Sequence, residues 1–432
     1  MYQECPDFNN NLEGEEYYRG IYPFKEVPRF CCFDKKDLMN DLNKIYLTDT
    51  TLRDGQQGWR VFTINECERI YELLAEFGKA VKSTEVFLYT EKDQLIAKRL
   101  VEYGYEYPKV IGWIRATRSD LKLVMDARLD ETVVLASISD YHIKHKFNLT
   151  RGEAIRKYLD VIEEALRNGI VPRVSLEDIT RADVENVVLP FIKRLLKLGE
   201  RYGLPVKIKL PDTLGLGLPF YEVSLPRSIP RIIIAIRSLG VPSENIEFHG
   251  HNDFGLVVAN QLAAWIYGAG GANCTLMGIG ERAGNCPLEV MAIHYAGIKG
   301  SSEINLRAVA KVPELLENMG YRIPDHYPFI GKNAFTTRAG IHVDGLVKNP
   351  EVYLPFDPIH VLGIPFSIAI TPYSGRSAIV LWIRNHLGRK DVNKDDPRVI
   401  AIYKEILEYF EKTGRTTPLD NHEVLSFIKK YF

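Results

Sequence analysis

From residue 46 to about residue 300 the chain repeats one unit, in which a short apolar, β-branched run is followed by a polar turn and a helical stretch. The segment TRGEAIRKYLDVIEEALRN (150–168), for example, has apolar residues at spacings of three and four, as an amphipathic helix does. The eight candidate strands are 45–47, 84–88, 109–114, 132–136, 171–176, 206–210, 246–249 and 274–277.

This alternation predicts an α/β fold, because strands and helices that alternate over roughly 250 residues are typical of a closed (β/α)8 TIM barrel. A doubly wound open sheet is the alternative, since hydrophobic periodicity does not show whether a sheet closes. The repeat stops at about residue 303. We therefore divide the chain into an N-terminal extension (1–45), a barrel (46–302) and a smaller, mostly helical C-terminal region (303–432).

The charge balance excludes two classes of partner. Lys and Arg number 55 against 56 Asp and Glu, so no net field attracts nucleic acid or an anionic membrane. No apolar run approaches the roughly 18 residues of a membrane span. The N-terminus is acidic and polar, unlike a secretory signal or transit peptide, and the six cysteines show no regular spacing. We expect a cytoplasmic protein with reduced thiols.

Polar side chains gather where the candidate strands end. In a (β/α)8 barrel the carboxyl ends of the strands form the active-site face. A solvated rim would favour a mixture of Lys and Glu over this supply of Asp, His, Asn and Arg. The residues at these ends are Asp49, Arg53, Asp54, Arg115, Ser139, Asp140, His142, Glu177, Asp178, Asp212, Thr213, His249, His251, Asn252, Asp253, Glu281, Arg282 and Asn285.

The sequence HGHND at the end of the seventh candidate strand predicts a metal site. Residues two apart in a strand point to the same side, so His249 and His251 face the barrel mouth together. Two neutral imidazoles and a carboxylate suit Zn²⁺, Mn²⁺, Co²⁺ or Fe²⁺ better than Mg²⁺. Barrel closure brings Asp54 and Asn285 into the same arc. The alternative is that the two histidines are a chance pair of ordinary polar residues. This alternative is less favoured because Asp54 is expected beside them.

Each of two further segments can be interpreted either as part of the chemistry or as part of the structure. Arg53 in TTLRDGQQ could grip a carboxylate or polarise a keto oxygen, or it could pair with Asp54 and shape the loop. The glycine-rich GIGERAGN (278–285) follows the last strand and misses GxGxxG by one residue, which favours tight loop packing over dinucleotide binding. His142, Glu177 and Thr213 are individually weak candidates, but all three would line the same mouth.

Taken together, DTTLRDGQQ, HGHND, GIGERAGNCPLE and GIHVDG resemble the isopropylmalate, homocitrate and citramalate synthase family over about residues 46–375. The resemblance implies a TIM barrel that holds one divalent ion (Mn²⁺, Co²⁺, Zn²⁺ or Mg²⁺) and condenses acetyl-CoA with a 2-oxo acid. It also implies a homodimer whose C-terminal region reaches into the partner subunit.

The resemblance assigns roles to particular residues. The implied metal ligands are Asp54, His249 and His251, with Asn285 in or near the shell. Arg53 and Thr213 would hold the 2-oxo acid, and Arg53, Glu177 and His342 would be catalytic. We add Gln57, Arg115 and His142 to the substrate-binding set. Arg115 is our hypothesis for the far carboxylate of a dicarboxylate acceptor, with Arg118 and Arg173 as alternatives. A C-terminal tyrosine, Tyr373 or another, would also take part.

Three departures resemble the branch that includes Re-type citrate synthases: DGQQ in place of DGEQ, LEDITRAD around Glu177, and the insertion GLGLPFYEVSLPRSIP. They favour oxaloacetate as the acceptor. The alternatives are an isopropylmalate or homocitrate synthase, an acyl-CoA lyase that would need Cys286, and a non-catalytic 2-oxo acid sensor. From its length we expect no leucine-binding regulatory domain of the kind found in typical isopropylmalate synthases.

Overall fold

The computed structural model describes residues 18–30 and 42–432. Their contacts divide into two compact units. The barrel unit holds residues 42–334 and 362–364, and the C-terminal unit holds residues 18–30, 335–361 and 365–432. Residues 303–334 thus group with the barrel, although the sequence predicts a C-terminal region that begins at residue 303. The remainder of the predicted N-terminal extension, including Cys31, lies outside the described residues.

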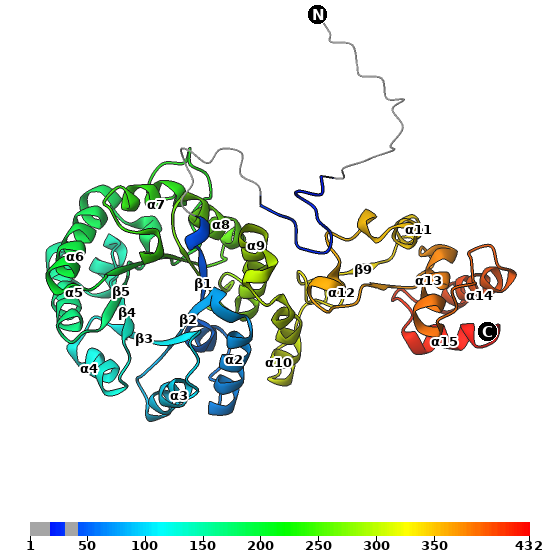
Figure 1. Ribbon diagram of the computed structural model, residues 1–432, viewed down its shortest axis with the longest axis horizontal. Coiled ribbons are helices and arrows are strands. Elements are labelled where there is room, and N and C mark those ends of the chain that lie inside the picture. The colour runs from blue at the N-terminus through cyan, green and yellow to red at the C-terminus, as the bar shows by residue number, and fades with distance from the viewer. Residues whose placement is uncertain (1–17, 31–41) are drawn as a thin grey trace, which may run out of the picture. The chain divides into compact units, whose positions relative to one another are not determined.

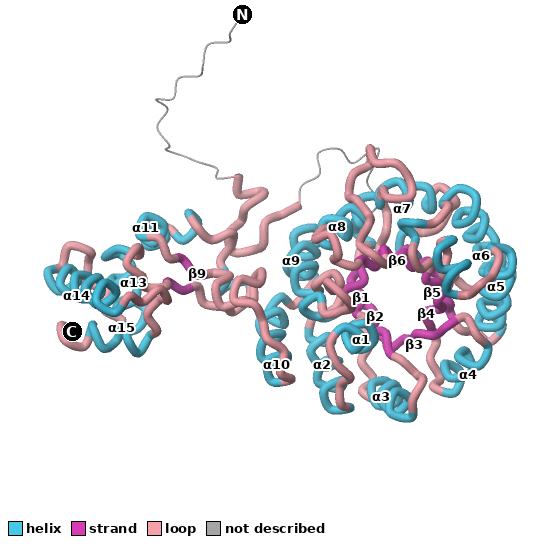
Figure 2. The backbone as a smooth tube through the Cα atoms, turned by 180° about the vertical axis from the view of Figure 1, so that it is seen from behind, coloured by secondary structure: helices cyan, strands magenta, loops and turns pink. Residues whose placement is uncertain are grey.

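The barrel unit is built on one closed sheet of parallel strands, and the eighth strand pairs with the first. Figure 2 shows the strands as a ring with the helices outside it. The predicted (β/α)8 barrel is confirmed, and an open sheet is excluded. The strands are β1 (Tyr46–Asp49), β2 (Val81–Val86), β3 (Lys109–Arg115), β4 (Glu131–Leu135), β5 (Val171–Ser175), β6 (Lys207–Asp212), β7 (Ile246–Gly250) and β8 (Gly271–Cys274).

One helix follows each strand and covers the outside of the barrel (Figure 1). Thr63, Thr90 and Thr150 each begin a helix with a reciprocal capping box, which satisfies backbone N–H groups of the first turn. The helices are α2 (Ile64–Glu76), α3 (Glu91–Glu102), α4 (Arg118–Asp126), α5 (Arg151–Arg167), α6 (Leu189–Tyr202), α7 (Ile229–Arg237), α8 (Val257–Tyr267) and α9 (Leu288–Lys299), followed by α10 (Val312–Asn318).

The eighth predicted strand is displaced. The sequence predicts this strand at 274–277, whereas β8 ends at Cys274 and a 3-10 turn, Leu276–Gly278, follows. Met277 in that turn has a φ of 57°. The strand itself is made of small residues, Gly-Ala-Asn-Cys, whose low β propensity hides it, while the β-branched and apolar residues after it imitate a strand.

Alternate residues of the barrel strands point into the lumen, and in this protein many of them are charged. Glu85 and Lys209 are both 0% exposed. Their strand neighbours Val86 and Ile208 are also buried, on the side that the helices cover. The lumen is therefore filled with polar groups and the layer between strands and helices with apolar ones.

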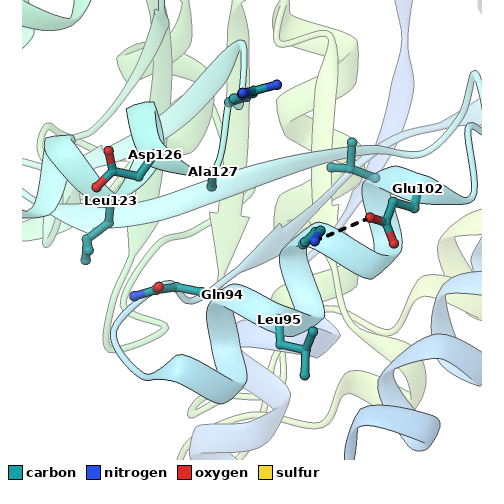
Figure 3. A pocket seen from close by; sticks show the side chains of 9 residues that line it. Gln94, Leu95, Glu102, Leu123, Asp126 and Ala127 are labelled. Carbon is teal, nitrogen blue, oxygen red and sulfur yellow. Dashed lines mark ion pairs between the residues drawn. The ribbon is translucent and has the colours of Figure 1, made fainter.

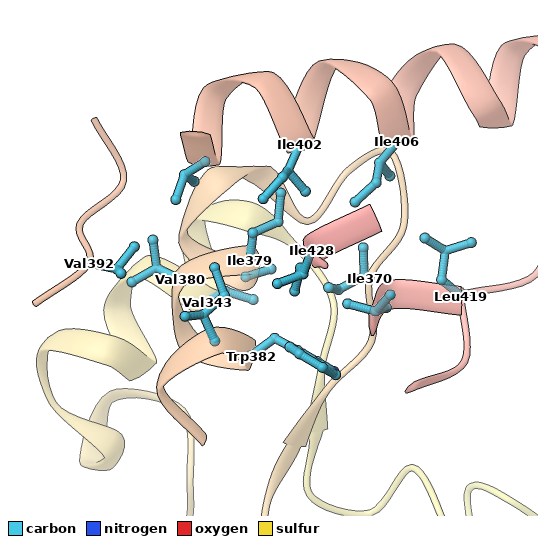
Figure 4. Packing of buried hydrophobic residues seen from close by; sticks show 14 of the residues in the cluster. Val343, Ile370, Ile379, Val380, Trp382, Val392, Ile402, Ile406, Leu419 and Ile428 are labelled. Carbon is cyan, nitrogen blue, oxygen red and sulfur yellow. The ribbon is translucent and has the colours of Figure 1, made fainter. Parts of the chain in front are cut away.

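The C-terminal unit has its own apolar core, in which Ile379 and Ile402 are 0% exposed (Figure 4). Residues 18–30 belong to this unit, and Arg19 Nη1 lies 2.6 Å from Glu351 Oε2. The predicted helical character is correct. The elements are β9 (Thr336–Thr337), α11 (Gly340–Lys348), α12 (Pro358–Val361), β10 (Ser367–Ile368), α13 (Gly375–Leu387), α14 (Pro397–Thr413) and α15 (Asn421–Ile428).

Among the helices of residues 18–30 and 42–432, none combines the length and the apolarity that crossing a membrane requires.

Candidate metal centre and active site

The turn after β1 carries two of the predicted site residues. Thr51–Gly55 form a π-helical turn that buries the side chains of Arg53 and Asp54 at the carboxyl end of the strand. Arg53 Nη1 lies 3.0 Å from Asp54 Oδ1. Burial raises the pKa of Asp54, but the Arg53 charge, together with the two histidines and the hydrogen bond from Asn285, outweighs burial and holds the pKa well below its usual range. Asp54 is therefore an ionised acceptor at neutral pH.

The two histidines at the end of β7 converge on Asp54. His249 Nε2 lies 3.3 Å from His251 Nε2, and Asp54 Oδ2 lies 3.5 and 3.9 Å from these two nitrogens. These ligand atoms all lie within 4.8 Å of one another, and all three residues are buried. The structure thus brings together the predicted Asp-His-His group, in an arrangement that could hold a metal ion.

The neighbours of His249 determine its tautomer. Its Nδ1 lies 2.7 Å from Asn273 Oδ1, and the same oxygen accepts a hydrogen bond from Lys209 Nζ at 3.0 Å. Since an ammonium group only donates, this Asn273 atom must be the oxygen, and Nδ1 of His249 must carry the proton. The Nε2 lone pair then points at His251 and Asp54, as a metal ligand requires.

Electrostatics and unsatisfied atoms also fit a cation. Burial, and then the charge of Lys209, hold the pKa of His249 well below its usual value, and burial lowers that of His251. Both imidazoles are therefore neutral. Asn285 Nδ2 donates to Asp54 Oδ2 at 2.5 Å, while Asn285 Oδ1 is buried without a hydrogen-bond partner among the described residues. A bound divalent ion would suit this donor set of nitrogen and oxygen atoms.

Arg53 is held beside this group by a carboxylate that the sequence analysis missed. Its Nε and Nη2 donate to Glu85 Oε2 at 3.2 and 3.1 Å, and its guanidinium lies 5.4 Å from the centre of the Trp113 ring. Gln57, exposed at the mouth, accepts from Arg53 Nη1 at 3.4 Å. The guanidinium is thus fixed in orientation before any substrate arrives.

Glu85 is one member of an ion-pair chain through the lumen. Lys209 pairs with Glu85 and lies 3.3 Å from Glu247, which in turn pairs with Arg173. Burial raises the pKa of Glu85, but Lys209 and Arg53 lower it further, to about 2. In the sequence, this ion-pair chain is indicated by charged residues at alternate positions of otherwise apolar strands. A buried charge needs a buried partner, so such residues are expected to pair inside the barrel.

Glu177, at the end of β5, lies beside Lys146 and His142. Lys146 Nζ lies 2.9 Å from Glu177 Oε2 and His142 Nδ1 lies 3.1 Å from it, while Ser137 donates a short hydrogen bond to the same oxygen. Burial raises the pKa of Glu177, but His142 and Lys146 lower it to about 2. Thr213, from the loop after β6, accepts a hydrogen bond from the Asp178 N–H at 2.9 Å.

The predicted arginines occupy different environments. Arg115 ends β3, where its Nε and Nη2 donate to Asp120 at 2.8 and 2.9 Å and leave the side chain 63% exposed. Arg118 pairs with Asp160 on the outside of the barrel. Arg173 is 2% exposed and lies near the amino ends of the strands, away from the mouth.

His342 and Tyr373 belong to the C-terminal unit, which is described separately from the barrel. His342 lies on α11, exposed, with its ring centre 4.4 Å from that of Tyr353. Tyr373 is 84% exposed. The catalytic role of His342 and the identity of the tyrosine stay predictions.

The glycine-rich loop packs as the sequence predicts. A Cβ atom on Gly58 would lie 2.0 Å from the Gly280 carbonyl carbon, and one on Gly280 would lie 2.6 Å from Asn285 Oδ1. The loops after β1 and β8 therefore touch through their backbones, which seats Asn285 beside Asp54. Arg282 binds chiefly Asp253, at 2.8 Å, with Glu281 farther away at 3.8 Å.

One cavity opens beside the mouth, between the loops after β3 and β4 and helix α5. It measures about 270 Å³. Its walls are Arg115, Ala116, Thr117, Leu135, Lys146, Phe147, Leu149, Lys157 and Tyr158. A larger cavity of about 660 Å³ lies between α3 and α4 on the outside of the barrel, lined by Gln94, Leu95 and Leu123 among others (Figure 3). Only the first of these two shares a residue, Lys146, with the Glu177 cluster.

Comparison with known proteins agrees with this geometry. Residues 44–316 match the HMGL-like family and residues 329–413 match the homocitrate synthase post-HMGL domain-like family. The chain is 44% identical to citrate (Re)-synthase of Clostridium kluyveri, over 98% of this chain and 95% of that protein. It is 37% identical to 2-phosphinomethylmalate synthase of Streptomyces hygroscopicus, over 98% of both.

A solved structure supports the fold alone. Hydroxymethylglutaryl-CoA lyase from Pseudomonas aeruginosa superposes with a TM-score of 0.52 at 16% identity, covering 65% of this chain and 94% of the lyase. The family match spans the whole barrel and includes the Asp-His-His group, and its second part continues into the C-terminal unit. The chain therefore belongs to the HMGL-like family, among relatives that include a citrate (Re)-synthase.

Proposed function

We propose that this protein is a metal-dependent citrate synthase of the Re type, which converts acetyl-CoA, oxaloacetate and water to citrate and CoA. The observation that carries the proposal is the convergence of Asp54, His249 and His251 beside a pre-oriented Arg53. The relationship to the C. kluyveri enzyme, at 44% identity over nearly the whole of both chains, supports the choice of oxaloacetate.

The mouth residues have complementary tasks in this reaction. A divalent ion held by Asp54, His249 and His251, with Asn285 nearby, would supply Lewis-acid chemistry to the keto and carboxylate oxygens of the acceptor. Arg53 donates to the same end of the acceptor and stabilises the negative charge that develops on the former keto oxygen. Thr213 offers its hydroxyl to the carboxylate, with Gln57 and His142 at the rim. Arg115 would receive the far carboxylate.

Glu177 and His342 would move the protons. A base must remove a methyl proton from acetyl-CoA so that the enol can attack the keto carbon, and hydrolysis of the thioester then releases CoA. With a pKa of about 2, Glu177 is ionised but a weak base while Lys146 and His142 surround it. Anionic groups of the co-substrate that draw Lys146 away would raise this pKa and make the carboxylate a stronger base.

The cavity of about 270 Å³ supports this assignment of the co-substrate. Lys146 and Lys157 present cations to it, and both lie within 6 Å of the Phe147 ring centre, at 5.4 and 5.8 Å. The phosphates of acetyl-CoA would meet these lysines while its thioester lies over the mouth. Lys157→Gln should raise the KM for acetyl-CoA and leave that for acetyl-pantetheine, which lacks the nucleotide, unchanged.

A homodimer would bring His342 of one subunit to the barrel of the other. The exposure of His342 and Tyr373 in the C-terminal unit is compatible with this arrangement. Co-expression of Asp54→Asn with His342→Ala tests it. If the residues act across subunits, the mixed dimers contain one intact site each and recover up to about a quarter of the wild-type activity. If both act within one chain, activity stays at the level of the single variants.

The competing functions receive less support. A lyase of this superfamily would depend on an accessible cysteine, whereas Cys286 is 0% exposed. A sensor would not need the oriented proton-transfer groups. The relative from S. hygroscopicus is named for a different product, and isopropylmalate and homocitrate synthases share the mechanism, so the acceptor has to be measured.

The decisive experiment is thiol release from acetyl-CoA by the protein reconstituted with Mn²⁺, Co²⁺, Zn²⁺ or Mg²⁺. Oxaloacetate, 2-oxoisovalerate, 2-oxoglutarate and pyruvate are compared under the same conditions. We expect turnover with oxaloacetate that EDTA abolishes. A preference for another acceptor would keep the mechanism and overturn the acceptor. No release with any acceptor and any metal would overturn the synthase.

A further inference from the structure

The amino end of the barrel, opposite the proposed active site, holds a second polar cavity of about 190 Å³. Most of its lining residues come from the first three positions of the strands, and Tyr107 and Glu244 precede β3 and β7, so the cavity closes the lumen at the end where TIM barrels are not known to place their active sites. They are Tyr46, Lys82, Ser83, Tyr107, Lys109, Glu131, Arg173, Lys207 and Glu244.

Positive charge exceeds negative charge in this cavity. Its lining holds the cations Lys82, Lys109, Arg173 and Lys207 but only two carboxylates. One of these, Glu131, is shared, because Arg173 and Lys207 both donate to it. Burial, and then the Arg173 charge, lower the pKa of Lys207. Arg173 also pairs with Glu247, so Glu131 and Glu247 balance Arg173 and Lys207, and the excess positive charge is that of Lys82 and Lys109.

The other lining groups do not neutralise this excess of positive charge. Glu244, the second carboxylate, pairs with Lys44 at 3.2 Å. Lys82 Nζ lies 4.1 Å from the Tyr107 ring centre, and neither Lys82 nor the exposed Lys109 has an ion pair within residues 18–30 and 42–432. Arg173 Nε is buried without a hydrogen-bond partner in the same part of the chain. An unpaired donor on a 2% exposed guanidinium is costly unless a ligand meets it.

We propose that this cavity is a binding site for a small multivalent anion, of the phosphate or polycarboxylate class. The volume has room for about six water molecules, at roughly 30 Å³ each, and lies below the ~300 Å³ of ordinary cofactor pockets. A compact anion therefore fits inside this cavity. The site lies at the opposite end of the strands from Asp54 and does not depend on the condensation reaction.

The test is isothermal titration calorimetry of the full chain with pyrophosphate and, separately, with tricarballylate. Lys82→Gln/Lys109→Gln removes two cations from the cavity. The control, Lys122→Gln/Lys193→Gln, removes two exposed lysines from the outer helices α4 and α6. We expect the cavity variant to weaken binding of at least one probe by tenfold or more, and the control by less than twofold.

Lys109→Gln alone, at an exposed position, provides a folded variant in case the double variant is unstable, and it should weaken binding about threefold or more. The thermal midpoint of wild type should rise with the same probe, and that rise should shrink in the cavity variants only. Preference for pyrophosphate or for tricarballylate decides the anion class. The proposal is overturned if wild type binds neither probe, or if the cavity and control variants bind equally well.

Discussion

The barrel lumen and the core of the C-terminal unit are both fully buried, yet they are filled by opposite kinds of side chain. In the lumen, Lys209 and Glu85 are 0% exposed and pair with each other. In the C-terminal core, the same degree of burial belongs to Ile379, Ile402 and Ile406 (Figure 4). Apolar packing stabilises without orienting any donor, whereas a buried ion-pair network orients its members at a cost in desolvation.

This difference shows what the lumen charges do. Glu85 fixes the guanidinium of Arg53, and Lys209 with Asn273 fixes the tautomer of His249. The side chains at the mouth are thus aligned by groups one layer below them. We expect changes in the lumen to alter metal binding and stability together, and changes in the C-terminal core to alter stability alone.

The largest effect should follow from a change at the mouth itself. Asp54→Asn keeps the shape of the side chain and removes the charge that faces both histidines. We expect a loss of roughly 10²–10³-fold or more in kcat/KM, because the proposed metal ion would bind weakly or in the wrong place. Metal content after dialysis, measured alongside thiol release, distinguishes lost metal from lost chemistry. Full metal binding with normal turnover in this variant would show that Asp54 is not a functional metal ligand.

The second largest effect should follow from a change in the lumen ion pairs that lie beneath the mouth. Lys209→Met leaves Glu85 and Glu247 buried without their shared cation, which should cost about 3–5 kcal/mol of unfolding free energy. The matched change in the apolar core, Ile402→Val, removes one methylene group and should cost about 0.5–1.5 kcal/mol. Urea unfolding measures both. If Ile402→Val also changed kcat/KM, the separation between the two regions would fail.

A smaller effect should come from the residue that sets the tautomer. Asn273→Ala removes the acceptor for the His249 Nδ1 proton without touching a metal ligand. Loss of such an orienting partner typically weakens metal affinity about 10–100-fold. Competition with a chromophoric chelator measures this affinity directly. Unaltered affinity would mean that His249 keeps its tautomer by other contacts.

The last effect concerns the pH dependence of stability. The pKa of Glu177 falls from 4.5 to about 2 in the folded chain, so its ionised form stabilises the fold. That contribution is complete above about pH 4.5 and is lost as the pH falls through about 2. Between those limits, acid should lower the stability of wild type more steeply than that of Glu177→Gln. Parallel urea curves for the two proteins at every pH would contradict the contact with Lys146 and His142.

The sequence by itself determined the architecture and the metal candidates. Alternating apolar runs and amphipathic stretches have few compact solutions, and the spacing of His249 and His251 on one strand places both side chains on one face. Asp54 and Asn285 could be added because their strand ends are near in a closed barrel. Each of these inferences uses local periodicity or the order of strands around a ring.

The tertiary structure decided what depends on partners distant in sequence. Glu85, Lys209 and Asn273 lie far apart along the chain and meet only because alternate residues of different strands point into one lumen. The position of β8 was wrong for a related reason, since burial by the surrounding helices and strands overrode the low β propensity of its residues. Arg173, a sequence candidate for the acceptor carboxylate, lies at the amino end because strand register, not residue type, sets depth in a barrel.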